Sequence, residues 1–227
     1  MSGKRSLFGS VVFAAVLASS ASAWAAPAPV PVPPLTPAVI VAKILAQNAG
    51  MQSYETDVHI ACRLLGFPYF GTRLDGKTYF KRPNNFEIIF DRLPSFAHGF
   101  ERMYSDIGDP SSWASTYYLE YVGETSFATH RDLVLRLIKK NRGMIDHEDV
   151  AIDPVAWHID NMQWFYYNGG YVSMSQDYRR EGPFLVLGAQ HATIRLPHVH
   201  AMAEASYENY HTNVAIDDAV FTKETSR

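Results

Sequence analysis

The sequence predicts an α+β protein in which a large antiparallel sheet, strongly curved into a barrel or a partial barrel, outweighs one or two helices. Three observations support this fold class. Apolar and polar side chains alternate from Tyr54 to Leu64, which is the period of a strand with one buried face. Further runs of this kind follow, separated by turns rich in Gly, Pro and Asn. An amphipathic helix precedes the first strand. No segment after residue 37 resembles a flexible interdomain linker, so we expect a single domain.

The predicted helix starts at Pro37. Thr36 is a suitable N-cap, because its hydroxyl can accept a hydrogen bond from the first turn, and Pro is favoured at the first helical position. Apolar residues then recur at helical spacing through Leu45. Gly50 is typical of a helix end, since it adopts the left-handed conformation without a steric penalty. This helix is the first candidate to cover the apolar face of the sheet.

The segment from Tyr54 to Asp91 is predicted to form three or four consecutive antiparallel strands with one shared apolar face. Asp75-Gly76 is its strongest hairpin signal, because a type I′ turn requires positive φ at both central residues. We therefore expect a turn there and a return strand from Lys77 to Lys81. The run from Phe86 to Phe90 repeats the alternation. Cys62, the single cysteine, falls on the apolar side and is expected to behave as a small hydrophobe.

The alternation stops between Leu93 and Ser115. Gly and Pro residues in this segment predict broken structure, with a short helix after Asp109-Pro110. Two interpretations stay open: a lid of exposed aromatic side chains, and a loop packed over the edge of the core. The candidate lid residues are Phe96, Phe100, Met103 and Trp113.

The second half of the chain is predicted to be almost entirely β-structure. Asn168-Gly169-Gly170 and Gly182-Pro183 are typical of hairpin turns, and we interpret Asp146-His147-Glu148-Asp149 as a polar turn. The predicted strands are Tyr117–Glu124, Asp132–Lys140, Ala151–Ile159, Trp164–Tyr167, Tyr171–Tyr178, Gln190–Leu196 and Ala201–Ile216.

The N-terminus has the pattern of a cleaved secretory signal. Lys4 and Arg5 precede an apolar run from Leu7 to Ala18, and Ala21-Ser22-Ala23 supplies small residues for cleavage. The alternative is a signal anchor, but the run is shorter than the roughly 20 apolar residues of a spanning helix. We expect residues 1–23 to be removed, 24–37 to form an Ala/Pro-rich linker and 38–227 to fold as one domain. The protein is then periplasmic, or secreted if its source lacks an outer membrane.

Composition and motifs exclude several functions. The net charge is −3 and there is no basic cluster, so nucleic acid is not an expected partner. The sequence has no Gly-x-Ser-x-Gly, His-Glu-x-x-His, P-loop or Gly-x-Gly-x-x-Gly motif, and no carboxylate pair stands out for glycoside chemistry. We therefore do not expect a common hydrolase, metalloprotease or nucleotide-binding protein, and no residues in the sequence mark an active site. His198, His200 and His211 are the candidates for a metal site, although a His-x-His pair alone is more often a pair of surface histidines.

The order of these parts, together with three segments, resembles a known family. The segments are Gly-Lys-Thr-Tyr-Phe-Lys-Arg-Pro from Gly76 to Pro83, Ala-Glu-Ala-Ser-Tyr-Glu-Asn-Tyr from Ala203 to Tyr210, and the ending from Asn213 to Phe221. The chain resembles the LolA-like outer-membrane lipoprotein-sorting and carrier proteins. The resemblance implies a fold of the LolA, LolB and LppX kind: an unclosed half-barrel wrapped around one or two helices, with an apolar cavity that holds acyl chains. It implies no catalysis and no cofactor.

A one-faced sheet larger than its helices can cover leaves apolar surface that a ligand, a partner or the protein's own core must bury. We therefore predict a monomeric, non-enzymatic periplasmic carrier of a lipid or an acylated protein, with a membrane protein as possible donor or acceptor. One alternative is an envelope-sensing interaction module of the same fold, as in related sigma-factor regulators. The other is a metal-dependent enzyme based on the three histidines. The predicted cavity lining is Val58, Ile60, Leu64, Phe86, Ile88, Phe90, Leu133, Leu135, Leu137, Trp157 and Ile159.

Overall fold

A computed structural model describes residues 35–66, 69–83, 85–92 and 110–222 of the chain. All of them belong to one unit that begins at Leu35. The predicted signal peptide and most of the predicted linker lie outside the described residues, so this division of the N-terminus stays a prediction.

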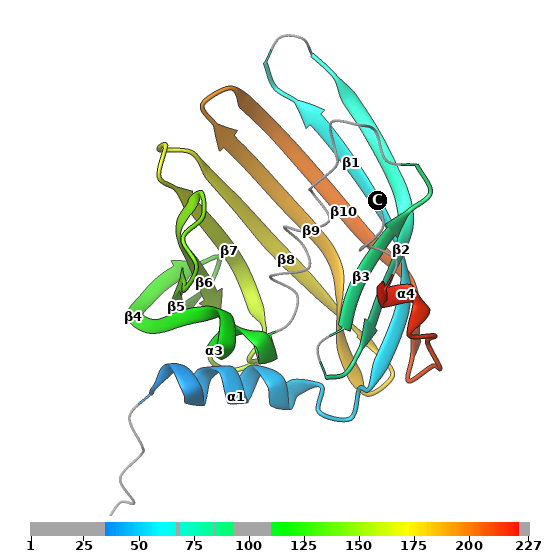
Figure 1. Ribbon diagram of the computed structural model, residues 1–227. Coiled ribbons are helices and arrows are strands. Elements are labelled where there is room, and N and C mark those ends of the chain that lie inside the picture. The colour runs from blue at the N-terminus through cyan, green and yellow to red at the C-terminus, as the bar shows by residue number, and fades with distance from the viewer. Residues whose placement is uncertain (1–34, 67–68, 84, 93–109, 223–227) are drawn as a thin grey trace, which may run out of the picture. The chain divides into compact units, whose positions relative to one another are not determined.

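Ten antiparallel strands form a single sheet, which curves but does not close (Figure 1). Their order across the sheet is β3-β2-β1-β10-β9-β8-β7-β6-β5-β4, so that β3 and β4 are the two edges. The predicted open antiparallel sheet is thereby confirmed. The strands are β1 (Ser53–Leu64), β2 (Gly71–Lys81), β3 (Asn85–Phe90), β4 (Tyr117–Phe127), β5 (His130–Lys139), β6 (Ile145–Ile152), β7 (Ile159–Tyr166), β8 (Tyr171–Glu181), β9 (Phe184–Leu196) and β10 (Val199–Thr212).

Helix α1 (Pro37–Gln47) lies across one end of the sheet (Figure 1). It begins as predicted, because the Thr36 hydroxyl accepts a hydrogen bond from the Val39 N–H at 3.4 Å. It ends at Asn48 rather than at Gly50. The Asn48 side chain donates to the Leu185 carbonyl at 2.7 Å and accepts from the Leu185 N–H at 3.0 Å. This bidentate contact fixes the end of α1 to β9.

The remaining helical elements are short. They are η2 (Pro110–Ser112), α3 (Trp113–Thr116) and α4 (Ala219–Thr222). The short helix predicted after Asp109-Pro110 is therefore present. Within the described ranges, no helix is both long and apolar enough to cross a membrane.

The turn predicted at Asp75-Gly76 is wrong, because both residues lie in the middle of β2. Asp75 is opposite His59 and Gly76 is opposite Val58 in β1. Gly76 is required there for a different reason. A Cβ at Gly76 would lie 2.4 Å from the Ile89 carbonyl oxygen and 2.8 Å from the Phe90 Cα, so the close approach of β3 leaves no room for a side chain.

Two more predictions need correction. The predicted strand Ala151–Ile159 is interrupted by a turn over residues 153–158, in which the Asp153 carboxylate accepts hydrogen bonds from two backbone N–H groups. Val155 in this turn is 86% exposed rather than on an inner face. The predicted polar turn Asp146–Asp149 is part of β6, where Asp149 forms a bidentate ion pair with Arg136 of β5. By contrast, the turns at residues 167–170 and at Gly182-Pro183 are both confirmed.

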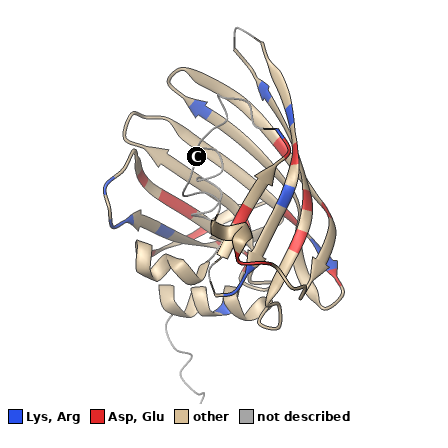
Figure 2. Cartoon of the chain, turned by 45° about the vertical axis from the view of Figure 1, so that its right-hand side comes forward, with Lys and Arg blue, Asp and Glu red and all other residues tan. Residues whose placement is uncertain are grey.

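The core lies on the inner face of the sheet and continues onto α1 and α3. It contains fully buried residues from widely separated parts of the chain, among them Ile40, Val58, Trp113, Leu135 and Ile152. Residues of both charge signs occur along the strands in the view of Figure 2.

Replacing Gly76 with Ala is expected to lower the free energy of unfolding by about 2–3 kcal/mol, because the new methyl group must displace the β3 backbone. Gly143→Ala is the matched control, since a Cβ at Gly143 would meet nothing within 4 Å. Urea unfolding measures both. An unchanged denaturation midpoint for Gly76→Ala would contradict the account of this close approach.

Thr56 and Thr78 face each other in β1 and β2 and are both 1% exposed, yet their hydroxyls differ. Thr56 donates to the Glu208 carbonyl at 2.6 Å, whereas the Thr78 hydroxyl has no hydrogen-bond partner among the described residues. Thr56→Val is expected to cost about 1–3 kcal/mol of stability, and Thr78→Val to cost nothing or to stabilise by about 1 kcal/mol. Thermal unfolding of the two variants tests this, and equal losses would contradict it.

Candidate functional site: an apolar cavity between the first helix and the sheet

A cavity of about 230 Å³ lies between α1 and the inner face of the sheet. Its volume is somewhat below the roughly 300–1,000 Å³ of typical small-molecule pockets, so it suits part of an elongated ligand rather than a bulky one. Side chains from α1 and from seven strands contribute to its wall. The apolar lining residues are Ile44, Leu45, Met51, Tyr54, Phe80, Pro83, Phe86, Pro110, Trp157, Ile159, Met162, Met174, Tyr178, Leu185, Val186, Leu187, Tyr207 and Tyr210.

β-Bulges bring tyrosine side chains into this wall. Thr56 of β1 faces two residues of β10, and the bulge places Asn209 at φ 52°. As a result, Tyr207 and Tyr210 both line the cavity although three positions separate them. A second bulge on β9 sits opposite Asp177/Tyr178 of β8. A strict period of two would have turned one tyrosine of the β10 pair to the opposite face.

The hydroxyl groups of three of the four tyrosines in the wall donate hydrogen bonds to the protein itself. Tyr207 donates to Gln190 Oε1 at 2.7 Å, Tyr178 to Gln176 Oε1 at 2.5 Å and Tyr210 to the Leu187 carbonyl at 2.9 Å. Burial raises the pKa of both Tyr178 and Tyr210 well above the ordinary value, so these phenols stay neutral. The cavity therefore offers aromatic surface without an added negative charge.

Lys, Arg, Asp and Glu are represented among the described lining residues by Arg82 alone, and its guanidinium group already forms hydrogen bonds within the protein. Its Nε donates to the Met51 carbonyl at 2.7 Å and its Nη2 to the Asn48 carbonyl at 3.0 Å. These bonds satisfy backbone oxygens where α1 leads into β1. Because the Arg82 guanidinium group is hydrogen-bonded to the backbone and the tyrosines are neutral, the cavity favours a hydrocarbon over a charged ligand.

The turn between β6 and β7 forms one side of the cavity and is held by α1. Trp157 lies in this turn at φ 55°, a conformation that non-glycine residues rarely adopt. The Lys43 ammonium group lies 5.6 Å from the centre of the Trp157 ring, and the Gln47 side chain donates to the Ala156 carbonyl. The helix thus fixes an unusual backbone conformation beside the cavity.

The structure brings three of the eleven predicted lining residues to this cavity, namely Phe86, Trp157 and Ile159. The others belong to the core around it. Val58, Ile60, Ile88, Leu133, Leu135 and Leu137 are buried, and Leu64 and Phe90 are partly buried against them. Alternation identifies an inward-facing side chain, but not whether that side chain meets another side chain or an empty space.

Sequence reasoning missed the methionines and tyrosines of the wall. Met162 and Met174 lie directly opposite each other in β7 and β8, and Met side chains adapt readily to irregular gaps. The Tyr-x-x-Tyr segment at Tyr207 and Tyr210 could have indicated a bulge. Residues three positions apart lie on opposite faces of a regular strand, so two large rings that are both buried on one face require an extra residue between them.

The candidate lid is mostly outside the described residues. Phe96, Phe100 and Met103 belong to the undescribed segment. Trp113 is fully buried in α3 and is not among the lining residues. Pro110 and Ser111, which follow the undescribed segment 93–109, do line the cavity.

The structure does not bring the three candidate metal-binding histidines together. His200 and His211 are eleven residues apart along β10, which corresponds to about 35 Å at the rise of an extended strand. His198 lies in the turn before that strand, and all three are exposed. The described residues that could share an ion are instead His130, Asp132, Asp153, His158 and Asp160, near the β6–β7 turn.

No family model and no curated protein matches the chain. Among solved structures, a domain assigned to outer membrane lipoprotein sorting from Vibrio parahaemolyticus has a TM-score of 0.64 and 10% identity, covering 82% of this chain and 96% of that one. A DUF1329 family protein from Desulfovibrio piger has a TM-score of 0.65 and 10% identity, covering 84% and 99%. A LolA superfamily protein from Nitrosomonas europaea has a TM-score of 0.58 and 10% identity, covering 84% and 99%. The likeness at this identity establishes the fold, and the chain has the LolA-like fold that its sequence resembles.

Proposed function

We propose that the chain is an exported, non-enzymatic carrier that binds an acyl chain of a lipid or a lipoprotein in the cavity between α1 and the sheet. The observation that carries this proposal is the lining itself. Aliphatic, aromatic and thioether side chains surround the space, and the hydroxyl groups of three of its four tyrosines donate hydrogen bonds to the protein. Burying each CH₂ group of a ligand in such a site contributes about 0.8 kcal/mol.

The fold is consistent with a carrier but does not indicate its cargo. The similar structures include one assigned to lipoprotein sorting and one of the LolA superfamily. Export rests on the predicted signal peptide, residues 1–23, and places the carrier in the periplasm, or outside the cell where there is no outer membrane. A lipid or acylated protein is then the cargo, and membranes or membrane proteins are its donor and acceptor.

Native mass spectrometry of protein purified without detergent tests the function directly. The proposal predicts a bound lipid or fatty acid, or uptake of one added fatty acid per chain. Protein that is empty, that ignores added fatty acids and that co-purifies with an inner-membrane protein would support the interaction module instead.

Brominated fatty acid is expected to quench the fluorescence of Trp157, because this side chain lines the cavity whereas Trp113 and Trp164 do not. The Trp157→Phe variant should lose the quenching on titration with the fatty acid. Trp164→Phe, which removes a buried tryptophan from β7, should retain it. Quenching that survives in Trp157→Phe would place the ligand elsewhere.

Enlarging a side chain in the wall should weaken binding. Val186 of β9 is 3% exposed and lines the cavity. Val186→Phe is expected to displace two or three methylene groups of the ligand, which corresponds to roughly 10- to 100-fold weaker binding. The control Val199→Phe makes the same change at an exposed position of β10. Equal affinity of Val186→Phe and the wild-type protein for a fluorescent fatty acid would contradict the assigned site.

A further inference from the structure

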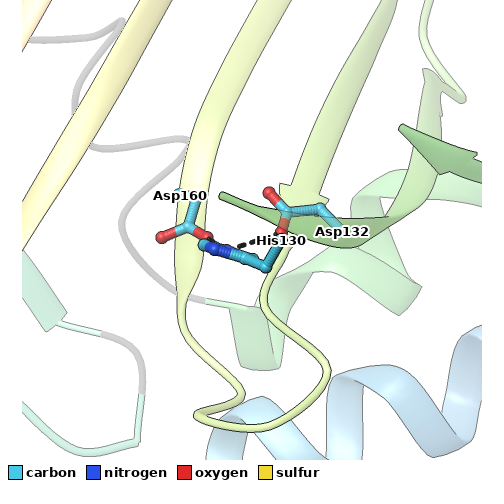
Figure 3. A group of neighbouring side chains, drawn as sticks. All are labelled: His130, Asp132 and Asp160. Atoms are coloured by element: carbon cyan, nitrogen blue, oxygen red, sulfur yellow. Dashed lines mark hydrogen bonds and ion pairs between the residues drawn. The ribbon is translucent and has the colours of Figure 1, made fainter. Parts of the chain in front are cut away.

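Histidine and aspartate side chains converge where the β4–β5 hairpin meets the start of β7. His130 is the first residue of β5, Asp132 follows two positions later, and Asp160 is the second residue of β7. The His130 Nε2 atom lies 2.8 Å from Asp160 Oδ2 and 3.0 Å from Asp132 Oδ1. Figure 3 shows the three side chains directed toward one another.

Local backbone structure places two more groups beside them. In the pairing of β6 with β7, Ile159 faces Ile152 and Asn161 faces Ala151, so Asp160 is the extra residue of a bulge. Bulges redirect side chains, often at functional sites. Asp153, at the start of the β6–β7 turn, uses Oδ1 to accept two backbone hydrogen bonds, and its Oδ2 lies 4.0 Å from His130 Nε2.

The cluster has an excess of negative charge. It contains three aspartates, and no Lys or Arg in the described ranges forms an ion pair with any of them. Asp132 is 0% exposed, and within the described part of the chain neither of its carboxylate oxygens accepts a hydrogen bond. The one hydrogen that His130 Nε2 can carry has Asp160 as its hydrogen-bond partner. A buried carboxylate without donors is costly unless a cation is close.

A divalent cation bound here would offset the negative charge of the three aspartates and would give both Asp132 oxygens a partner.

We propose that His130, Asp132 and Asp160 bind a divalent transition-metal cation, with the free oxygen of Asp153 within reach as a further ligand. One imidazole and several carboxylates suit ions such as Mn²⁺ and Zn²⁺. An octahedral ion with ligands at about 2.1 Å places neighbouring ligand atoms about 3.0 Å apart. The separations of 2.8 and 3.0 Å around His130 Nε2 agree with this spacing.

A neighbouring histidine provides outer support. His158 Nε2 lies 2.7 Å from Asp160 Oδ1, so that one oxygen of Asp160 is oriented by His158 while the other faces His130. Hydrogen-bonded partners of this kind fix metal-binding carboxylates. His158 and Ile159 also line the apolar cavity. The ion would therefore fix the β6–β7 turn that forms one cavity wall, but its binding does not depend on the cavity's ligand.

Calorimetric titration of the full chain, produced without a His tag and first treated with EDTA, tests the site with Mn²⁺ and with Zn²⁺. The expected result is one ion per chain. A hundredfold excess of ion over the dissociation constant should raise the melting temperature by about 5–10 °C. No saturable binding of either ion would overturn the proposal and leave a protonated His130 as the partner of the aspartates.

Two variants test which residues bind the ion. Asp132→Asn and His130→Gln should each weaken it at least 100-fold, and His130 is exposed enough for its variant to keep the fold. In the absence of metal, Asp132→Asn should melt at or above the wild-type temperature, because it removes an uncompensated buried charge. The matched control Asp177→Asn alters the exposed ion pair of Asp177 with His191. Unchanged binding in both site variants, or loss in the control alone, would contradict the assignment.

Discussion

The structure depends on one geometric constraint: the apolar inner face of a curved ten-stranded sheet is larger than its longest described helix can cover. α1 has eleven residues and places Ile40 and Val41 in the core. The sheet does not close on itself, because β3 and β4 remain separate edges. Part of the inner face is therefore filled by core side chains, and part borders a cavity. Under the proposed function, an acyl chain fills this remaining apolar space.

Departures from regular strand pairing determine which residues border that space. A bulge at Asn209 turns Tyr207 and Tyr210 to the same side, and a bulge at Asp160 brings this residue to the His130 cluster. The turn carrying Trp157 connects the two regions and is held by α1. Bulges alter the twist of a strand and the direction of its side chains at a single position, so a few of them shape both the cavity wall and the proposed cation site.

The sequence predicted the features that local chemistry decides. The cap at Thr36, the alternation in β1 and the turn at residues 167–170 each depend on neighbours within a few positions, and each is present. Gly76 was misinterpreted as a turn residue. Glycine is needed there because the β3 backbone leaves no room for a side chain, and not because the position has a positive φ. A glycine next to an aspartate has the same local pattern in a turn and at a close strand contact.

The candidate sites were less predictable for the same reason. The wall of the cavity and the cluster of His130, Asp132 and Asp160 combine residues from distant strands whose register and bulges the sequence does not display. Leu135 and Ile159 had equivalent patterns in the sequence, yet Leu135 meets other core side chains and Ile159 borders the cavity. Alternation therefore identified the buried face and left the location of the empty space undetermined.

The most direct measurement is a crystal structure of the protein grown with a brominated fatty acid, in which anomalous scattering locates the bromine. The account predicts a bromine signal between α1 and the sheet, beside Trp157, Met174 and Tyr207. A side-chain-filled cavity without bromine, or bromine bound only on the outer surface, would contradict the claim that this sheet is completed by a guest hydrocarbon.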